Sequence, residues 1–187
     1  MELPEIDACK LTLDPNTVHR FLLLSEENRK MTDTEDYHHY PDHPERFDGF
    51  QQALCREGLS GSRHYWEVEW SKLANIGVAY KGIGRKGMGL ECSFGHNDQS
   101  WILECDRTFF VNSCSFCHKN KNTEITAPIT RRIGVYLDHS AGILSFYSIS
   151  DWLKKMTLLH TVKTTFTEPL YPALGVCEGT VTLCKLG

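Results

Sequence analysis

The sequence lacks an excess of basic charge, a secretion signal and any apolar stretch long enough to cross a bilayer. Its 187 residues include 20 Lys and Arg against 24 Asp and Glu, whereas a protein whose main task is to bind nucleic acid carries a basic field. The first five residues, Met-Glu-Leu-Pro-Glu, are acidic and contain no apolar run. We therefore expect a cytoplasmic protein without a membrane role.

Long helical patterns and internal repeats are also missing. About a dozen short segments alternate apolar and polar residues between turn signals, which favours an all-β antiparallel sandwich or barrel. The clearest hairpin spans residues 133–147, where Ile133, Val135 and Leu137 share one face and Gly142 marks the turn. With 41% hydrophobic residues, the chain can fill one sizeable core. We predict a single domain over residues 1–187.

The other elements follow from the same period of two. Further strands are predicted at residues 9–13, 21–24, 64–70, 74–80, 100–103, 108–111, 156–162, 170–176 and 180–184. Residues 47–54 fit either a helical face or a short strand at 53–55, and residues 2–8 form at most a short helical lead-in. Polar or glycine-rich loops are predicted at residues 33–46, 82–89 and 114–127.

Eight cysteines occur, but they do not predict a disulfide framework. A chain of this length with a good core and no secretion signal is expected to keep free, mostly buried thiols in a reducing compartment.

Several short motifs could carry chemistry. Residues 82–87 match G-x-G-x-x-G without a good helix after them, so a mobile loop is favoured over a nucleotide site. Residues 114–118 match C-x-x-C-H, which could form half of a zinc site with Cys92 or Cys105, although thiols in a variable loop are favoured. Glu67 and Glu69 are interpreted as the polar face of a strand rather than an acid–base pair. We predict neither a cofactor nor a metal, and no catalytic residue.

Three stretches together resemble one family. Residues 11–15 (LTLDP), 65–69 (YWEVE) and 137–147 (LDHSAGILSFY) are similar, in order and spacing, to the motifs of the PRY–SPRY domain. Residues 40–47 further resemble a fish branch found in tripartite-motif proteins, NOD-like receptors and stonustoxin-type toxins. The resemblance implies a bent sandwich of two antiparallel sheets. In it, a PRY segment at about residues 7–56 completes the sheets of a SPRY segment at residues 57–187.

The same resemblance implies a non-catalytic module that recognises a protein or peptide. In this interpretation it gives substrate or pathogen-target specificity to an intracellular innate-immune protein, most simply a tripartite-motif ubiquitin ligase acting in antiviral defence. We expect no ligation from the chain itself, because no RING motif is present. The isolated domain is expected to be monomeric and its parent dimeric through a coiled coil. A fish NOD-like receptor is the alternative parent. RNA or small-anion binding is the alternative function, through a local basic patch of Lys119 and Lys121 beside Arg85 and Lys86.

By position relative to these motifs, the pocket of the antibody-binding family member falls at Asn75, Glu104, Asp106 and Glu178. The carboxylates there predict an acidic pocket that prefers a basic or hydrogen-bonding peptide. Loops at residues 37–46, 82–93, 104–107 and 114–122 are expected to surround it. The candidate binding residues are Tyr37, His39, Tyr40, Asn75, Arg85, Lys86, Glu104, Asp106, Arg107 and Glu178.

Overall fold

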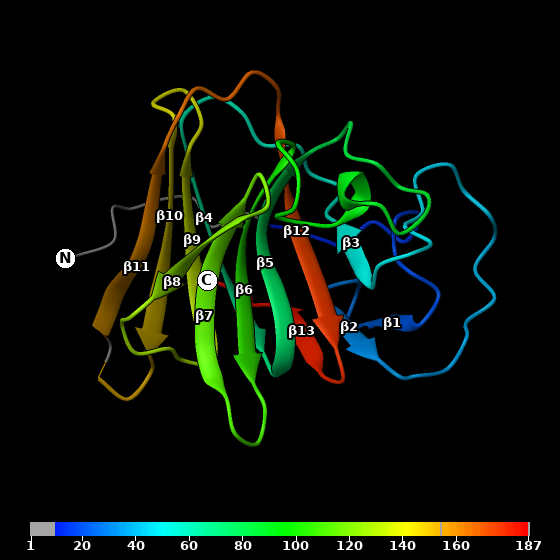
Figure 1. Cartoon of the computed structure of the whole chain (residues 1–187), viewed down its shortest axis with the longest axis horizontal. Coiled ribbons are helices and arrows are strands. Elements are labelled where there is room, and N and C mark those ends of the chain that lie inside the picture. Colours follow the sequence, from blue (N-terminus) through cyan, green and yellow to red (C-terminus); the bar gives the residue numbers. More distant parts are fainter. Residues whose placement is uncertain (1–9, 154, 187) are drawn as a thin grey trace.

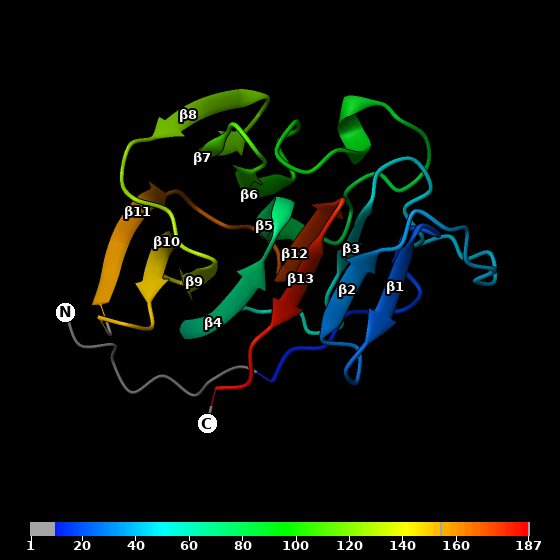
Figure 2. The ribbon, with the colours of Figure 1, turned by 90° about the horizontal axis from the view of Figure 1, so that it is seen from below.

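The computed structural model describes residues 10–153 and 155–186, which form two antiparallel sheets packed face to face (Figures 1 and 2). In spatial order, the seven-stranded sheet contains β1 (Leu22–Ser25), β2 (Lys30–Asp33), β13 (Thr180–Leu183), β4 (Arg63–Trp70), β9 (Arg132–Asp138), β10 (Ile143–Ser150) and β11 (Lys155–Lys163). The six-stranded sheet contains β3 (Gln52–Leu54), β12 (Leu170–Cys177), β5 (Lys72–Tyr80), β6 (Ser100–Arg107), β7 (Asn112–His118) and β8 (Lys121–Ile125). Within the described ranges the only helix is the short 3₁₀ turn η1 (Leu90–Cys92). No described helix is long and apolar enough to cross a membrane. The predicted all-β sandwich is confirmed.

The N-terminal strands complete both sheets, as the resemblance implied. β2 pairs antiparallel with β13, and β3 pairs antiparallel with β12. Strands from the two ends of the chain therefore lie side by side, and the β1–β2 hairpin extends the edge of the larger sheet. The first strand predicted, at residues 9–13, is reduced to one bridge between Leu13 and Cys55. Cys9 and the lead-in at residues 2–8 lie outside the described residues.

The central hairpin is β9–β10, and its pattern of faces is as predicted. Val135 pairs with Phe146, and Leu137 pairs with Leu144. All four side chains are completely buried between the sheets. Gly142 closes the turn with φ +72°, and a Cβ there would lie 1.7 Å from the carbonyl oxygen of Thr164. The turn therefore requires glycine for both its backbone conformation and its close approach to another chain segment.

Two sequence predictions between β6 and β8 are wrong. Residues 108–111 form the turn between β6 and β7 rather than a strand, and Phe109 and Phe110 are 94% and 91% exposed there. Conversely, the loop predicted at residues 114–127 contains most of β7 and all of β8. The polar composition misled the prediction because the outward side chains of these strands face a solvent-filled cleft instead of a second layer.

The region between β2 and β4 settles one open alternative. Residues 47–54 do not form a helix. The short strand β3 (Gln52–Leu54) begins and ends one residue earlier than the strand predicted at 53–55. Residues 37–46 and 82–89 are irregular, as predicted.

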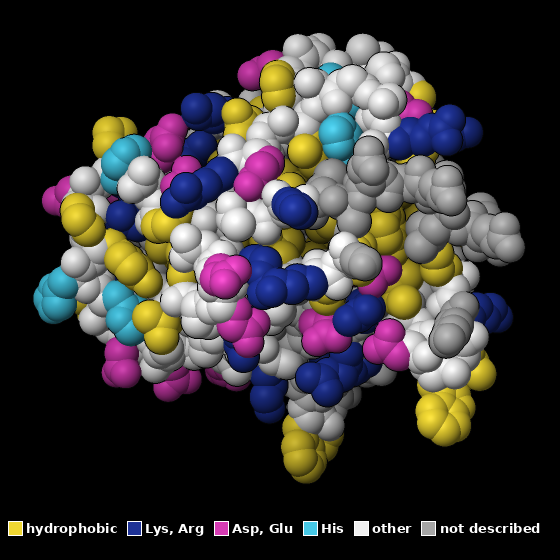
Figure 3. Space-filling model, turned by 180° about the vertical axis from the view of Figure 1, so that it is seen from behind, with side chains coloured by type: hydrophobic (Ala, Val, Ile, Leu, Met, Phe, Trp, Pro, Cys, Tyr) yellow, Lys and Arg dark blue, Asp and Glu magenta, His cyan; other side chains and the backbone are white. Residues whose placement is uncertain are grey.

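The surface mixes both signs of charge, and hydrophobic side chains stand out from the lower edge of the molecule (Figure 3). Exposed aromatics at turns of the chain include Phe109, Phe110 and Trp152.

Candidate functional site

The outer face of the six-stranded sheet is hollowed into a cleft of about 660 Å³. Its floor is one row of laterally paired residues: Gly175, Asn75, Glu104, Ser115 and Glu124. Their neighbours along the strands, such as Leu103, point into the core between the sheets. Because side chains alternate along a strand, the row presents its polar groups to one side only.

A second row lies beside the first. It runs from Cys177 through Leu73 and Asp106 to Ser113, and all four residues line the cleft. The sequence did not identify Ser113, Ser115 and Glu124 as site residues. The signal that could have identified Ser113 and Ser115 is the alternation of polar and apolar residues between 113 and 116, which indicates a strand with one open face.

The remainder of the same face is covered by the loop between β5 and β6. Ile83 and Phe94 of this loop pack on Ile102 and Ala173 of the sheet, together with Phe47. The loop and η1 lie toward the β3 side of the sheet (Figure 1). The cleft is the part that these apolar side chains leave uncovered.

Polar bonds fix the position of this covering loop. Gln52 of β3 donates through its side-chain amide to the carbonyl of Cys92, and its Oε1 accepts from the amide of Phe94 at 3.3 Å. Gln52 is buried. The wall of the cleft is therefore held by a satisfied interior amide rather than by surface contacts.

The cleft is acidic. Glu104, Asp106 and Glu124 line it, and no Lys or Arg occurs among its described lining residues. Nε2 of His96 lies 3.0 Å from Oε1 of Glu104. The Oδ1 atom of Asp106 is shielded from solvent and has no hydrogen-bond partner among the described residues, so a ligand donor reaches it only if the carboxylate turns toward the cleft.

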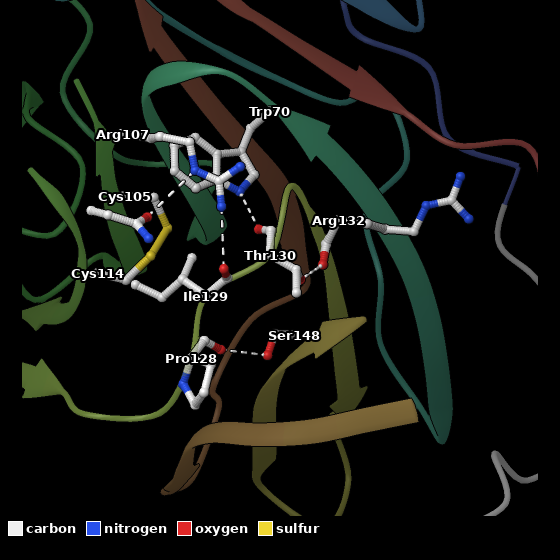
Figure 4. Close-up of a disulfide and its surroundings, with 10 residues drawn as sticks. Trp70, Cys105, Arg107, Cys114, Pro128, Ile129, Thr130, Arg132 and Ser148 are labelled. Carbon is white, nitrogen blue, oxygen red and sulfur yellow. Dashed lines mark hydrogen bonds between the residues drawn. A yellow bond between two sulfur atoms is a disulfide. The ribbon is translucent and has the colours of Figure 1, made fainter. Parts of the chain in front are cut away.

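A disulfide between Cys105 and Cys114 links β6 to β7 beneath the cleft (Figure 4). The two residues are directly opposite each other in the ladder, with their Cα atoms 4.2 Å apart. The prediction that all thiols are free is wrong for this pair, since only the fold places residues nine positions apart face to face. Cys55, Cys92 and Cys117 are free and buried, as expected.

The C-x-x-C-H motif does not form a site as a unit. Cys114 is in the disulfide, and the ring of His118 stacks on Trp101 at 4.6 Å, with Nδ1 2.7 Å from the carbonyl oxygen of Ser100. Burial lowers the pKa of His118. Because the motif lies on a strand, Cys117 and His118 face opposite sides of the sheet.

The predicted basic residues serve the structure. Arg85 donates to the carbonyls of Ile83, Glu45 and Lys81, and its guanidinium lies 4.9 Å from the ring centre of Phe47. Burial lowers its pKa. Lys86 donates to the carbonyls of residues 43 and 46.

Arg107 lies near the cleft but does not line it. Its guanidinium lies 5.5 Å from the ring centre of Trp70, and it donates to the carbonyl of Ile129 at 3.2 Å (Figure 4). It thus ties the end of β6 to the segment that precedes β9.

Tyr37, His39 and Tyr40 form a separate surface. Tyr37 contacts both Phe21 and His39 edge to face, with ring centres 6.4 and 5.0 Å apart. The Tyr40 hydroxyl donates to the carbonyl of Leu22 at 2.8 Å. None of the three lines the cleft.

Glu178 also lies outside the cleft lining, in the turn between β12 and β13, where its amide donates to Asp33. Of the ten candidate binding residues, the cleft brings together Asn75, Glu104 and Asp106.

Glu67 is not part of a solvated polar face. It is buried, accepts from the Tyr65 hydroxyl and lies 3.2 Å from Arg132, which also contacts Glu69 at 3.0 Å. Burial, together with the bond to Glu67, raises the pKa of Tyr65. The interpretation as a polar strand face therefore holds only for Glu69, because Arg132 on β9 compensates the buried charge of Glu67.

Comparisons with known proteins agree with this architecture. The family model described as the SPRY-associated domain matches residues 11–59, and that of the SPRY domain matches residues 63–185. Stonustoxin subunit beta of Synanceia horrida is 45% identical over 168 residues, which are 88% of this chain and 23% of the toxin subunit. Tripartite motif-containing protein 16 of Mus musculus is 37% identical over 184 residues, 96% of this chain and 32% of that protein.

Among solved structures, the "Crystal structure of TRIM65 PSpry domain" superposes with a TM-score of 0.84 at 27% identity, covering 96% of this chain and 92% of that one. The chain thus spans about a quarter to a third of the curated relatives and nearly all of an isolated domain. It belongs to the SPRY domain family, with the SPRY-associated PRY segment preceding the SPRY domain.

Proposed function

We propose that this domain is a non-catalytic recognition module that binds a basic or hydrogen-bonding segment of a protein in the cleft. The observation that carries the proposal is the acidic lining of the cleft, where Glu104, Asp106 and Glu124 have no Lys or Arg beside them among the described lining residues. Carboxylates arranged in this way attract cationic side chains and disfavour acidic partners.

Two details favour a peptide over a small anion. The carboxylate of Asp106, which lines the cleft, can accept a hydrogen bond from an amide, guanidinium or ammonium group of a peptide. The neighbouring Ser113 and Ser115 offer hydroxyls that can accept or donate. An anion would instead bring negative charge to a site already lined by it.

RNA binding is less favoured. It required a patch joining Arg85 and Lys86 to Lys119 and Lys121. The guanidinium of Arg85 and the ammonium of Lys86 are committed to backbone carbonyls, so these two cations are not available to phosphates.

We propose that the parent protein is an innate-immune protein, most simply a tripartite-motif ubiquitin ligase whose targets this domain selects. The similarity to tripartite motif-containing protein 16 supports this parent. The higher identity to a stonustoxin subunit, 45% against 37%, shows that the domain also occurs in toxins, and a fish NOD-like receptor is the alternative parent. We further propose that the isolated domain is monomeric and that the parent dimerises through a coiled coil.

A cytoplasmic location is part of the same proposal. The disulfide between Cys105 and Cys114 argues against it, because such bonds are rare in reducing compartments. Trapping thiols with an alkylating agent at the moment of cell lysis would decide the matter: an alkylated pair supports the cytoplasm, and a protected pair indicates an oxidising compartment.

The function is tested by measuring fluorescence anisotropy of a labelled peptide library graded in Lys and Arg content. The test variant is Asp106→Asn with Glu124→Gln, and the matched control is Asp36→Asn with Glu168→Gln, two exposed acidic residues outside the cleft. We expect the wild type and the control to select basic peptides with an affinity that falls as salt rises. The cleft variant should bind them at least about tenfold more weakly.

Equal affinity in the cleft variant and the wild type would refute the cleft as the site. Tyr37→Ala with His39→Ala, two exposed residues whose replacement spares the buried Arg46, provides the next comparison. Loss of binding in that variant alone would move the site to the separate surface around Tyr37.

A further inference from the structure

Three potential metal ligands converge at one end of the cleft floor. His96 lies in the covering loop, Glu104 lies on β6, and Cys117 lies on β7. One ligand atom of each lies within 4.8 Å of the other two. Cys117 is fully buried, whereas His96 and Glu104 keep 27% and 28% of their side chains exposed. The cluster is thus closed on the sulfur side, and Glu104 is the member that lines the cleft.

The hydrogen bonds of His96 leave one nitrogen facing a carboxylate. Nδ1 lies 2.7 Å from the amide oxygen Oδ1 of Asn120. Because a carbonyl oxygen can only accept, Nδ1 carries the hydrogen, and a neutral ring then directs the lone pair of Nε2 at Oε1 of Glu104, 3.0 Å away. Two lone pairs at that distance repel each other unless a cation lies between or beside them.

The nearby thiol decides which kind of cation fits best. A proton on Nε2 would satisfy His96 and Glu104, but it would do nothing for Cys117, whose Sγ lies 3.9 Å from Nδ1 and donates weakly to the carbonyl of Gly95. A divalent metal ion can bind all three groups at once, since it deprotonates a coordinating thiol.

The backbone conformation at Gly95 allows the covering loop to lie close to Cys117. Gly95 has φ +86°, and a Cβ there would lie only 2.9 Å from Cβ of Cys117. Any other residue would push His96 away from the sheet.

We propose that His96, Glu104 and Cys117 form a zinc site with three protein ligands and an open fourth position toward the cleft. Imidazole nitrogen, carboxylate oxygen and thiolate sulfur are the donors that zinc takes in proteins, and three protein ligands with one open position is an arrangement it adopts. The contact of Nδ1 with Asn120 would orient the ring as outer hydrogen bonds do for metal-bound imidazoles. Cys117 is the one residue shared with the C-x-x-C-H motif, and its partners here come from elsewhere in the chain.

The test uses the whole domain carrying Cys177→Ser, which removes an exposed thiol that could bind metal on its own. The protein is stripped with a chelator and titrated with zinc against a chromophoric competitor. We expect one equivalent of zinc per chain. His96→Gln and Cys117→Ser should each weaken binding at least about tenfold, whereas His118→Gln, a neighbouring imidazole outside the cluster, should leave it unchanged.

Cobalt provides a second readout. Cobalt bound to the Cys177→Ser domain should show a thiolate-to-metal charge-transfer band. The band should be retained when His118→Gln is added and lost when Cys117→Ser is added. If Cys117→Ser does not fold, as judged by circular dichroism, Glu104→Gln at the more exposed position replaces it, with the same expected loss of zinc affinity.

Two results would overturn the proposal: a folded Cys177→Ser domain that takes up no zinc, or zinc uptake that His96→Gln and Glu104→Gln leave unchanged. His96 and Glu104 would then be an ion pair joined by a proton. The outcome is separable from the proposed peptide binding. Asp106→Asn with Glu124→Gln spares all three ligands and should keep zinc while losing the peptide. If both proposals hold, zinc should weaken the binding of basic peptides, because it reduces the negative charge beside Glu104.

Discussion

Arg46 offers the sharpest test of how the N-terminal segment is held. It ends the loop at residues 37–46, yet its side chain is only 2% exposed. Its guanidinium donates twice to the carbonyl of Pro41, at 3.2 and 2.8 Å, and once each to those of Pro15 and Val18, at 2.9 and 2.8 Å. It also lies 5.1 Å from the ring centre of Tyr40. One planar cation thus joins the segment at residues 15–18 to the loop at residues 37–46.

The change Arg46→Met keeps much of the apolar stem and removes every donor. An orphaned buried acceptor costs about 1–3 kcal/mol. The carbonyl of Val18 lies in a buried residue and should carry the full cost, whereas those of Pro15 and the exposed Pro41 can be partly rehydrated. We therefore expect the free energy of unfolding to fall by about 3–4 kcal/mol. Arg46→Lys should recover about half of this, because an ammonium keeps the charge without the planar fork.

Urea unfolding followed by tryptophan fluorescence measures these changes. Arg56→Met at an exposed position is the matched control and should change the stability by less than about 0.5 kcal/mol. A loss below about 1 kcal/mol in Arg46→Met would refute the reasoning, as would an Arg46→Lys variant no more stable than Arg46→Met.

Two further predictions concern the disulfide and pH. Reduction of the disulfide between Cys105 and Cys114, which are nine residues apart, should lower the free energy of unfolding by about 2–3 kcal/mol. Reductant should have no effect on the control variant Cys105→Ser with Cys114→Ser. Equal unfolding midpoints of the wild type with and without reductant would contradict this prediction. Burial lowers the pKa of His118 and His160 below their ordinary 6.5. The unfolded chain therefore takes up protons first, and stability should be full above that value and fall as pH drops below it. Thermal melts from pH 8 to 5 should show this slope, flattened in His118→Gln with His160→Gln; a stability that rises toward pH 5 would oppose it.

The sequence predicted the central hairpin well. Val135, Leu137, Leu144 and Phe146 alternate with polar residues, and a buried strand face needs no more than this local period of two. The sequence-based prediction failed at β7. Residues 113–116 alternate polar and apolar side chains just as regularly there, but the surrounding polar composition was interpreted as a loop. The same failure hid part of the cleft, because Ser113 and Ser115 look like loop residues until the neighbouring strand is known.

The structure brings three of the ten candidate binding residues, Asn75, Glu104 and Asp106, together in one cleft, and their position relative to the family motifs had already grouped them. Arg85 and Lys86 were candidates because they lie in a predicted loop on a rigid scaffold, where binding residues often occur. Here the loop folds back, and backbone carbonyls take their hydrogen bonds.

By itself, the sequence determined the all-β class and the central hairpin, because strand periodicity and turn chemistry act between near neighbours along the chain. Only the tertiary structure decided which side chains meet. The strand register paired Cys105 with Cys114 and aligned Asn75 with Glu104. The packing of the covering loop brought His96 to Cys117. Such contacts depend on distances between segments far apart in the chain, which no local pattern of residues encodes.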